Sequence, residues 1–436
     1  MTDVLISTTD RGSKKGNSEV IPKSILIPFI LLTSCFALWG LANNMTDVLI
    51  AQFRKVFTLT DMQSGLVQTA FYGAYFVLAL PAALFIQRYS YKAGVLLGLG
   101  LFACGAILFY PAAQAMQYLP FLMALFVLAG GLSILETSAN PYIIAMGPEE
   151  TATRRLNIAQ AFNPVGSITG VVIGKVYILS QLNPATDVER AAMSSAELSA
   201  IQTSELNAVM MPYLMVAAVI VFVWLAIAFT KMPAAKDTVA ESDLDMSIRA
   251  TFGRLMQKKH FVKGVIGQFF YVGCQIGCWS WTIRYVMTQV GGTEAEASTY
   301  LLVSIITFSV FRFVCVGLIK YIAPEKLLAA LALVASVLVL MLMTIGGVAG
   351  AYALVGISAC MSLMFPTIFG LSLRDLGSDS KFGGSCLIMA ILGGAVLTAI
   401  MGQISDSMGI QAAFIIPLIG FAYLIYFGLN GYKIKQ

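Results

Sequence analysis

Residues 118–146 read YLPFLMALFVLAGGLSILETSANPYIIAM, an apolar run whose single charged side chain is Glu136. About 20 predominantly apolar residues are enough for a helix to cross a bilayer. The run therefore predicts a membrane-spanning helix that carries an acid inside the bilayer. Such an acid is costly to hold there, so a functional role is the first hypothesis for it.

Similar runs fill the rest of the chain. Of its 436 residues, 58% are hydrophobic and 11% are charged, whereas a soluble domain carries about 25% charged residues. We therefore predict an all-α membrane protein with twelve transmembrane helices in two pseudo-symmetric six-helix bundles. Besides 118–146, the predicted spans are 25–51, 63–86, 94–113, 156–181, 208–231, 262–288, 298–320, 326–346, 350–374, 382–404 and 411–430.

The polar segments divide the chain. We expect a tail over 1–24, an N-terminal bundle over 25–231, a linker over 232–261, a C-terminal bundle over 262–430 and a second tail over 431–436. The halves resemble each other weakly: Asn140-Pro141 and Phe365-Pro366 are each followed by a basic loop and a Gly-rich helix. Such repeats are typical of transporters that hold substrate between their halves near the midplane.

Lysine and arginine indicate the orientation, because cytoplasmic loops carry the excess of both. One side holds the N-terminal tail, the central linker and the loops around Arg88, Arg154, Lys320, Arg374 and Lys433. The loop 182–207 on the other side is net acidic. We expect a multi-pass protein of a bacterial inner membrane, with both termini cytoplasmic and no cleaved signal peptide.

Composition also argues against several functions. The net charge of +5 is spread over short loops, so we expect no nucleic-acid partner. The seven cysteines lie in apolar runs and the single histidine, His260, lies in the linker, so we expect no metal site and no cofactor. No nucleophile–base pair stands out, so we predict no catalytic residue and no enzyme.

Two acids inside spans, Asp47 and Glu136, are the candidates for proton coupling. Asn43 and Asn140 lie four residues from them on the same helix faces. A buried carboxyl takes up a proton readily, because its charged form loses hydration. The alternatives are a structural ion pair with Lys175 or Arg312, and, for Asp47, a direct contact with sugar hydroxyls near the outer mouth. For Lys175, Arg284 and Arg312 a structural role is favoured.

Two spans carry polar stripes at helical spacing, which lipid cannot satisfy. The stripes are Asn157, Gln160, Asn163 and Ser167 in one helix, and Gln268, Tyr271, Gln275, Trp279 and Thr282 in another. Amides donate and accept hydrogen bonds at once and therefore match sugar hydroxyls, while an aromatic ring covers the apolar face of a sugar. The alternative is that the amides join neighbouring helices. We predict substrate binding by Asn43, Asn140, Gln160, Asn163, Gln275, Tyr271 and Trp279.

The same residues carry a resemblance. From about residue 25 to about residue 417 the chain resembles the bacterial L-fucose:proton symporter family of the major facilitator superfamily. The basic loop of that superfamily survives only as Arg88 and Lys92. The specific stretches are Ala42-Asn43-Asn44 with Asp47, Leu135-Glu136-Thr137, Ala139-Asn140-Pro141, Arg155-Leu156-Asn157, Phe162-Asn163, Tyr271-Val272-Gly273, Cys278-Trp279-Ser280 and Pro366-Thr367-Ile368.

The resemblance implies proton coupling and sugar recognition at Asp47 and Glu136, and a sugar contact at Asn163. It implies L-fucose as the first candidate among monosaccharides, the proton as the coupling ion, and contact with membrane lipid. We expect a monomer. Met364 and Phe365 replace the polar and tyrosine side chains of the family before Pro366, which affects the choice of sugar. The alternatives are a sodium-coupled glucose/galactose carrier, a drug or organic-anion exporter of the same fold, and a non-transporting sensor.

Overall fold

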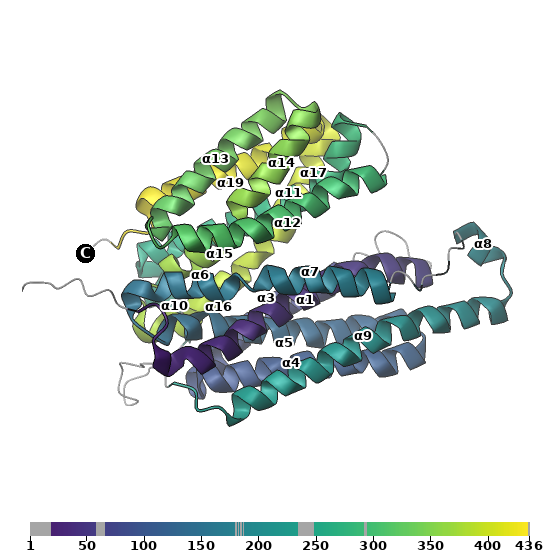
Figure 1. Cartoon of the computed structure of the whole chain (residues 1–436), viewed down its shortest axis with the longest axis horizontal. Coiled ribbons are helices and arrows are strands. Elements are labelled where there is room, and N and C mark those ends of the chain that lie inside the picture. Colours follow the sequence, from purple (N-terminus) through teal and green to yellow (C-terminus); the bar gives the residue numbers. More distant parts are fainter. Residues whose placement is uncertain are drawn as a thin grey trace, which may run out of the picture.

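The computed structural model describes residues 19–57, 66–178, 187–233, 248–291 and 294–434, together with Gln181, Asn183 and Ala185. Throughout these ranges every regular element is a helix (Figure 1).

The N-terminal half follows the predicted spans closely. Its α-helices are α1 (Leu26–Val56), α3 (Leu66–Arg88), α4 (Tyr91–Ala115), α5 (Tyr118–Ala145), α6 (Ala152–Gln160), α7 (Asn163–Ile173), α8 (Asp187–Ala192) and α9 (Ser195–Phe229). Short 3-10 turns are η1 (Lys23–Ile25) and η2 (Glu149–Thr151), and α7 continues into a π-helical turn, η3 (Gly174–Ile178).

The C-terminal half begins after the short helix α10 (Ile248–Gln257). Its helices are α11 (Lys259–Gln289), α12 (Glu294–Leu318), α13 (Pro324–Thr344), α14 (Gly347–Met361), α15 (Met364–Ser372), α16 (Ser380–Met389), α17 (Gly393–Met408), α18 (Ile410–Ala413) and α19 (Ile415–Tyr426). The turns between them are η5 (Gly377–Asp379) and η6 (Ala390–Leu392), and a π-helical turn, η7 (Phe427–Gly431), ends the half.

Among the described residues, eleven helical segments are long and apolar enough to cross a membrane. Helix α11 is the predicted span that is not among them. It has 31 residues, and at 1.5 Å per residue that length exceeds the roughly 30 Å of hydrocarbon in a bilayer. Its low hydropathy follows from the polar stripe on one face. With α11 the spanning segments number twelve, as predicted.

Several spans are broken where the sequence analysis expected one continuous run. The run 156–181 is divided into α6, α7 and η3, with turn residues at Ala161 and Phe162. Pro164 stands at the start of α7, where its missing N–H costs nothing and its ring favours a new helix. The run 350–374 is likewise divided into α14 and α15 by turn residues at Ser362 and Leu363, and α15 begins two residues before Pro366.

The segment 182–207 is more helical than expected. It contains α8, and α9 already begins at Ser195. The Ser194 side chain accepts from the Glu197 backbone N–H and the Glu197 carboxylate accepts from the Ser194 backbone N–H, which forms a capping box. Polar residues therefore start this helix well outside the apolar run. Residues 63–65 of the second predicted span, by contrast, lie outside the described part of the chain.

Small residues bring α1 and α7 close together. A Cβ added at Gly166 would overlap the backbone carbonyl of Ala37, and one added at Gly40 would overlap the carbonyl of Asn163. Close backbone approach at small residues is a common basis of helix association in membranes. This contact fixes the start of α7, where Asn163 lies, against the middle of α1.

The two halves meet mainly at one end (Figure 1). Helices α15 and α16 of the C-terminal half contact α6 and α3, respectively, at the end where α10 lies, whereas α8 lies at the opposite end. Asn157 Nδ2 donates to Thr367 Oγ1 at 3.2 Å across this contact. Lys381 Nζ lies 5.4 Å from the centre of the Tyr91 ring. The halves are thus held together at the α10 end by polar and cation–π contacts.

Candidate functional site

The Glu136 side chain lies in the middle of α5 and is 3% exposed. The Tyr75 hydroxyl and the Asn140 amide are its polar neighbours, yet neither carboxylate oxygen has a hydrogen bond of ordinary geometry. A buried polar group without a partner is expensive. The two free oxygens therefore form a site that a proton or the donor group of a ligand can satisfy.

A small cavity borders this acid. Its walls are Cys35, Phe36 and Trp39 of α1 and Leu132, Leu135, Glu136 and Ala139 of α5. Its volume of about 10 Å³ for the centre of a water-sized molecule is room for one water. Trp39 lies 6.3 Å, ring centre to ring centre, from Phe365 of α15. The cavity therefore has one acidic group in an aromatic and aliphatic wall, and its Trp39 side lies close to the C-terminal half.

A chain of hydrogen bonds connects the first polar stripe to the helix of Glu136. Gln160 Nε2 donates to Asn140 Oδ1 at 2.7 Å, and Asn140 Nδ2 donates to the backbone carbonyl of Glu136 at 3.1 Å. Both amide side chains are buried. The predicted site residues Asn140, Gln160 and Glu136 are thus brought together by two different helices.

The Asn163 side chain is half-buried at the first turn of α7. Its Nδ2 donates to the backbone carbonyl of Phe36 at 3.2 Å. Since Phe36 lines the cavity beside Glu136, Asn163 lies one contact away from that cavity. Its Oδ1 has no hydrogen bond in the described structure and is available to a ligand.

The second stripe fixes α11 against α14. The Tyr271 hydroxyl donates to the backbone carbonyl of Met361 at 3.1 Å, and Trp279 Nε1 donates to Ser358 Oγ at 3.0 Å. Gln275 is half-buried between them on the same helix. The structure therefore gives Tyr271 and Trp279 a helix-joining role through their polar atoms, while their rings stay near Phe365 and Phe308.

Asn43 is half-buried in α1. The backbone of Asp47 continues the same helix, but its side chain lies outside the described residues, as does that of Lys175. The predicted role of Asp47 therefore stays a prediction.

Arg312 does not form the ion pair with Glu136 that the sequence left open. Its side chain is buried on α12, and Nη1 donates to the backbone carbonyl of Gln160 at 3.1 Å. That carbonyl ends α6, where the helix dipole favours a cation. The guanidinium also lies 4.9 Å from the ring centre of Phe308. Arg312 therefore joins the two halves beside the amide chain. Arg284 is exposed and lies over Trp281.

Three features of the site were missed by the predicted list. Tyr75, beside Glu136, sits in a run with no polar pattern around it. Gln268 was part of the α11 stripe but was not chosen; it is fully buried, and both polar atoms of its amide are unpaired. Phe365 lies between Trp39 and Tyr271, at 6.3 and 6.2 Å. In the sequence, the one indication that Phe365 belongs to the site was its difference from the family pattern before Pro366.

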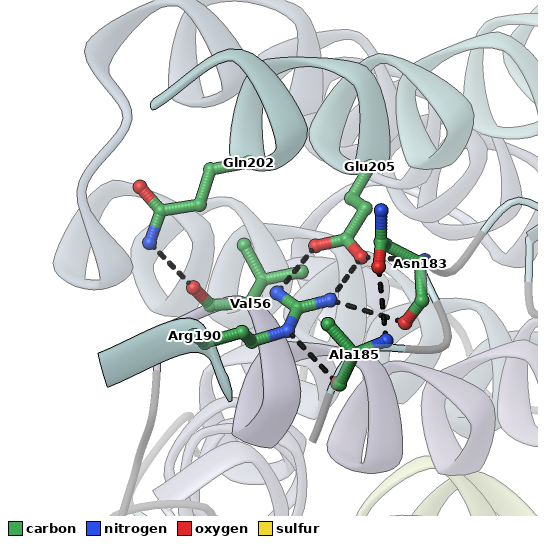
Figure 2. Close-up of polar contacts among 6 residues, drawn as sticks. All are labelled: Val56, Asn183, Ala185, Arg190, Gln202 and Glu205. Carbon is green, nitrogen blue, oxygen red and sulfur yellow. Dashed lines mark hydrogen bonds and ion pairs between the residues drawn. The ribbon is translucent and has the colours of Figure 1, made fainter. Parts of the chain in front are cut away.

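A buried ion pair at the α8 end was also missed (Figure 2). Arg190 Nη1 donates to Glu205 Oε2 at 3.0 Å, and the two side chains are 0% and 1% exposed. The Arg190 guanidinium also donates to the carbonyls of Asn183 and Ala185, and the Asn183 N–H donates to Glu205 Oε1. Nearby, Gln202 Nε2 donates to the carbonyl of Val56 at 2.7 Å. We call the contacts among Asn183, Ala185, Arg190 and Glu205 the clasp. Together with the Gln202–Val56 bond, the clasp holds the α7–α9 connection and the end of α1 against α9.

Comparison with known proteins shows which family has this architecture. The family described as Major Facilitator Superfamily matches residues 30–381. The "L-fucose-proton symporter" of Haemophilus influenzae is 43% identical over 433 residues, covering 96% of this chain and 100% of the relative. The "Glucose/galactose transporter" of Brucella abortus is 37% identical over 404 residues, covering 92% and 93%.

A solved structure agrees. The crystal structure of the major facilitator superfamily transporter FucP in the outward conformation superposes with a TM-score of 0.89 at 42% identity, covering 95% of this chain and 100% of that chain. The proton:xylose symporter XylE, at 11% identity and a TM-score of 0.68, shares the fold. All of these relatives are named as transporters or symporters. Identity and coverage of this extent show that the chain belongs to the major facilitator superfamily and, within it, to the family of the L-fucose-proton symporters.

Proposed function

We propose that this protein takes up L-fucose, or a closely related monosaccharide, together with protons across the bacterial inner membrane by alternating access. The observation that carries the proposal is the position of Glu136. This buried acid has no cation beside it in the described structure and borders a small cavity between α1 and α5, and the Trp39 ring of that cavity lies 6.3 Å from Phe365 of the other half. The names of the 43%-identical relatives support the sugar and the coupling ion.

In this proposal Glu136 and Asp47 exchange the proton. Asn43, Asn140, Gln160, Asn163 and Gln275 meet the hydroxyl groups of the sugar, and Tyr271 and Trp279 cover its apolar face. The amide chain from Gln160 through Asn140 to the helix of Glu136 supports this assignment, because a sugar that binds the amides also shifts the surroundings of the acid.

Contacts at the α10 end support a state that is closed to the cytoplasm. On the orientation predicted from the basic loops, with both termini cytoplasmic, α10 and the Asn157–Thr367 contact lie on the cytoplasmic side. The proposed cycle opens these contacts after sugar and proton are bound, and closes the two halves at the α8 end instead.

The second candidate is a sodium-coupled glucose/galactose carrier, and the observation that favours it concerns the sugar. Relatives with 37% identity are named glucose/galactose transporters. Phe365 favours a change in sugar, since an aromatic ring without a hydrogen-bonding group lies between Trp39 and Tyr271.

The test is uptake by purified protein in sodium-free proteoliposomes with an imposed pH gradient. Labelled L-fucose, D-glucose, D-galactose and L-arabinose are compared. We expect L-fucose to accumulate on the pH jump alone and competition to be strongest from L-fucose itself. Uptake that needs sodium, or that is specific for D-glucose, would replace the proposal by the second candidate. Absence of transport of all four sugars, by protein that is folded, would reject both.

A further inference from the structure

A second cavity lies away from the candidate site, between α1, the α7–η3 segment and α9. We call it the apolar groove. Its walls include Leu38 and Leu41 of α1, Ile173 and Tyr177 of α7–η3, and Pro212 and Val216 of α9. Its volume is about 230 Å³, against about 10 Å³ for the cavity beside Glu136. This larger space is therefore outside the proposed sugar site.

The chemistry of the groove excludes a polar occupant. Two of the nine lining residues, Thr169 and Tyr177, carry a side-chain hydroxyl, and the Thr169 hydroxyl donates to the Val165 carbonyl of its own helix at 2.8 Å. Water is not held in a cavity that offers it no hydrogen-bonding partners. An empty space of this size forfeits the dispersion contacts of every wall atom. The groove therefore calls for an apolar molecule.

The bilayer is the source of that molecule. The three walls belong to membrane-spanning helices, and the groove is continuous with their lipid-facing surface, where Val172, Met215 and Val219 are 52%, 58% and 51% exposed. From Thr169 to Tyr177 the groove runs about 12 Å along the helix axis. That length fits within the roughly 15 Å of hydrocarbon in one leaflet.

The backbone itself shapes the groove. Residues Gly174–Ile178 form a π-helical turn, and Pro212 stands inside α9. A π turn widens a helix locally, and an internal proline removes one backbone hydrogen bond and bends the helix. Both irregularities lie at the walls, so the concavity comes from the course of two helices and not from one small side chain.

We propose that one acyl chain of a membrane phospholipid occupies the apolar groove and fixes the position of α1. Helix α1 is the shared wall: Leu38 and Leu41 face the groove, whereas Cys35, Phe36 and Trp39 face the cavity of Glu136. The bound chain supports α1 from behind. This inference does not depend on which sugar or ion is transported.

The test is phospholipid retention by the full-length protein. Protein reconstituted with palmitoyl-oleoyl phosphatidylethanolamine is returned to detergent and examined by native mass spectrometry. The variant Val216→Trp fills the groove from a 6%-exposed wall position. The matched control, Phe222→Trp, changes a 71%-exposed position on the same helix outside the groove. We expect Val216→Trp to lower the lipid-bound fraction about tenfold, the effect of displacing about two buried methylenes, and Phe222→Trp to leave it unchanged.

A second filling variant, Ile173→Phe, enters the groove from α7 and keeps the test decisive if Val216→Trp does not fold. Folded variants that retain as much phospholipid as the wild-type protein would overturn the proposal. It would equally be overturned by a lipid-free dimer that Val216→Trp dissociates, because a second copy of the chain would then cover the groove.

Discussion

At the scale of single residues, Glu136 combines burial with two unsatisfied oxygens. Ordinary buried acids are paired, as Glu205 is with Arg190, whereas Glu136 has only a tyrosine and an amide nearby. An acid kept without a cation is free to exchange its proton when water reaches it. The contrast between these two glutamates within one half is what supports the coupling role proposed for Glu136 and a structural role for Glu205.

Glu136→Gln is expected to abolish accumulation of sugar against its gradient while sparing exchange of sugar across the membrane. The amide keeps the size and hydrogen-bonding capacity of the acid, but it has no proton to release. Accumulation driven by a pH gradient is measured beside counterflow in the same proteoliposomes. Glu149→Gln, on an exposed 3-10 turn, is the control that should behave as wild type. Full accumulation by Glu136→Gln would remove this residue from coupling.

Asn163→Ala is expected to weaken sugar binding about tenfold, the size of one hydrogen bond to a polar ligand. Binding is measured by calorimetry with L-fucose. Asn44→Ala is the matched control, because the Asn44 side chain donates to the Gly40 carbonyl within α1. If both variants bind sugar as wild type does, Asn163 has only the helix-joining role that its contact with Phe36 provides.

Residue types and helical spacing were enough to select Glu136, Asn140 and Gln160, since apolar runs make each polar exception conspicuous. They did not predict that Gln160 donates to Asn140, because a helical period says which residues share a face and not which helix lies opposite. Phe365 was harder still: an aromatic residue in an apolar run has no signature of its position at the centre.

At the scale of elements, the clasp around Arg190 and Glu205 organises the α8 end of the N-terminal half (Figure 2). The predicted loop 182–207 became part of a helical, tightly bonded structure for two reasons. The Ser194–Glu197 capping box starts α9 early, and the ion pair is shielded from water. Net acidic composition had indicated only a solvated loop, since composition does not show which charges pair.

The variant Glu205→Gln is expected to destabilise the protein by about 3 kcal/mol, because the buried guanidinium of Arg190 loses its counter-charge. Thermal unfolding in detergent measures the change. The double variant Arg190→Met/Glu205→Leu should lose less than Glu205→Gln alone, since no buried charge is left unpaired. Equal losses in the two variants would mean that the charges act independently.

Element boundaries were predicted well where apolar runs end in polar residues, as at Arg88 in α3 and beside Gln117 at the start of α5. The internal breaks were not predicted. Hydropathy stays high through Ala161-Phe162 and through Ser362-Leu363, and the break is set by the prolines that follow, Pro164 and Pro366. Backbone geometry, and not polarity, divides these spans.

At the scale of the whole molecule, the contact between α6 and α15 defines one state of the protein. A Cβ on Gly370 would lie 3.0 Å from Thr153 Oγ1, and Arg374 Nη2 donates to the same oxygen at 3.5 Å. In alternating access these helices must separate once in every cycle.

A disulfide between Thr153→Cys and Gly370→Cys is expected to stop transport while preserving sugar binding. The two side chains are close enough for the Cβ separation of about 4 Å that a disulfide needs. Uptake and binding are compared after oxidation and after reduction, with each single-cysteine variant treated in parallel. Reduction should restore uptake. Undiminished uptake by the fully cross-linked protein would show that α6 and α15 stay together throughout transport.

The polarity of α11 has a consequence for biogenesis. Among the described residues, this helix is the predicted span that is less apolar than the other eleven, because Gln268, Gln275 and their neighbours interrupt its apolar surface. A helix with such a polar face inserts into lipid poorly by itself. Its insertion becomes more favourable when a neighbouring apolar helix packs against the polar face. During synthesis of the second half, α11 is therefore expected to enter the bilayer only once α12 has emerged beside it. The polar stripe of α11 would in this way make assembly of the bundle cooperative.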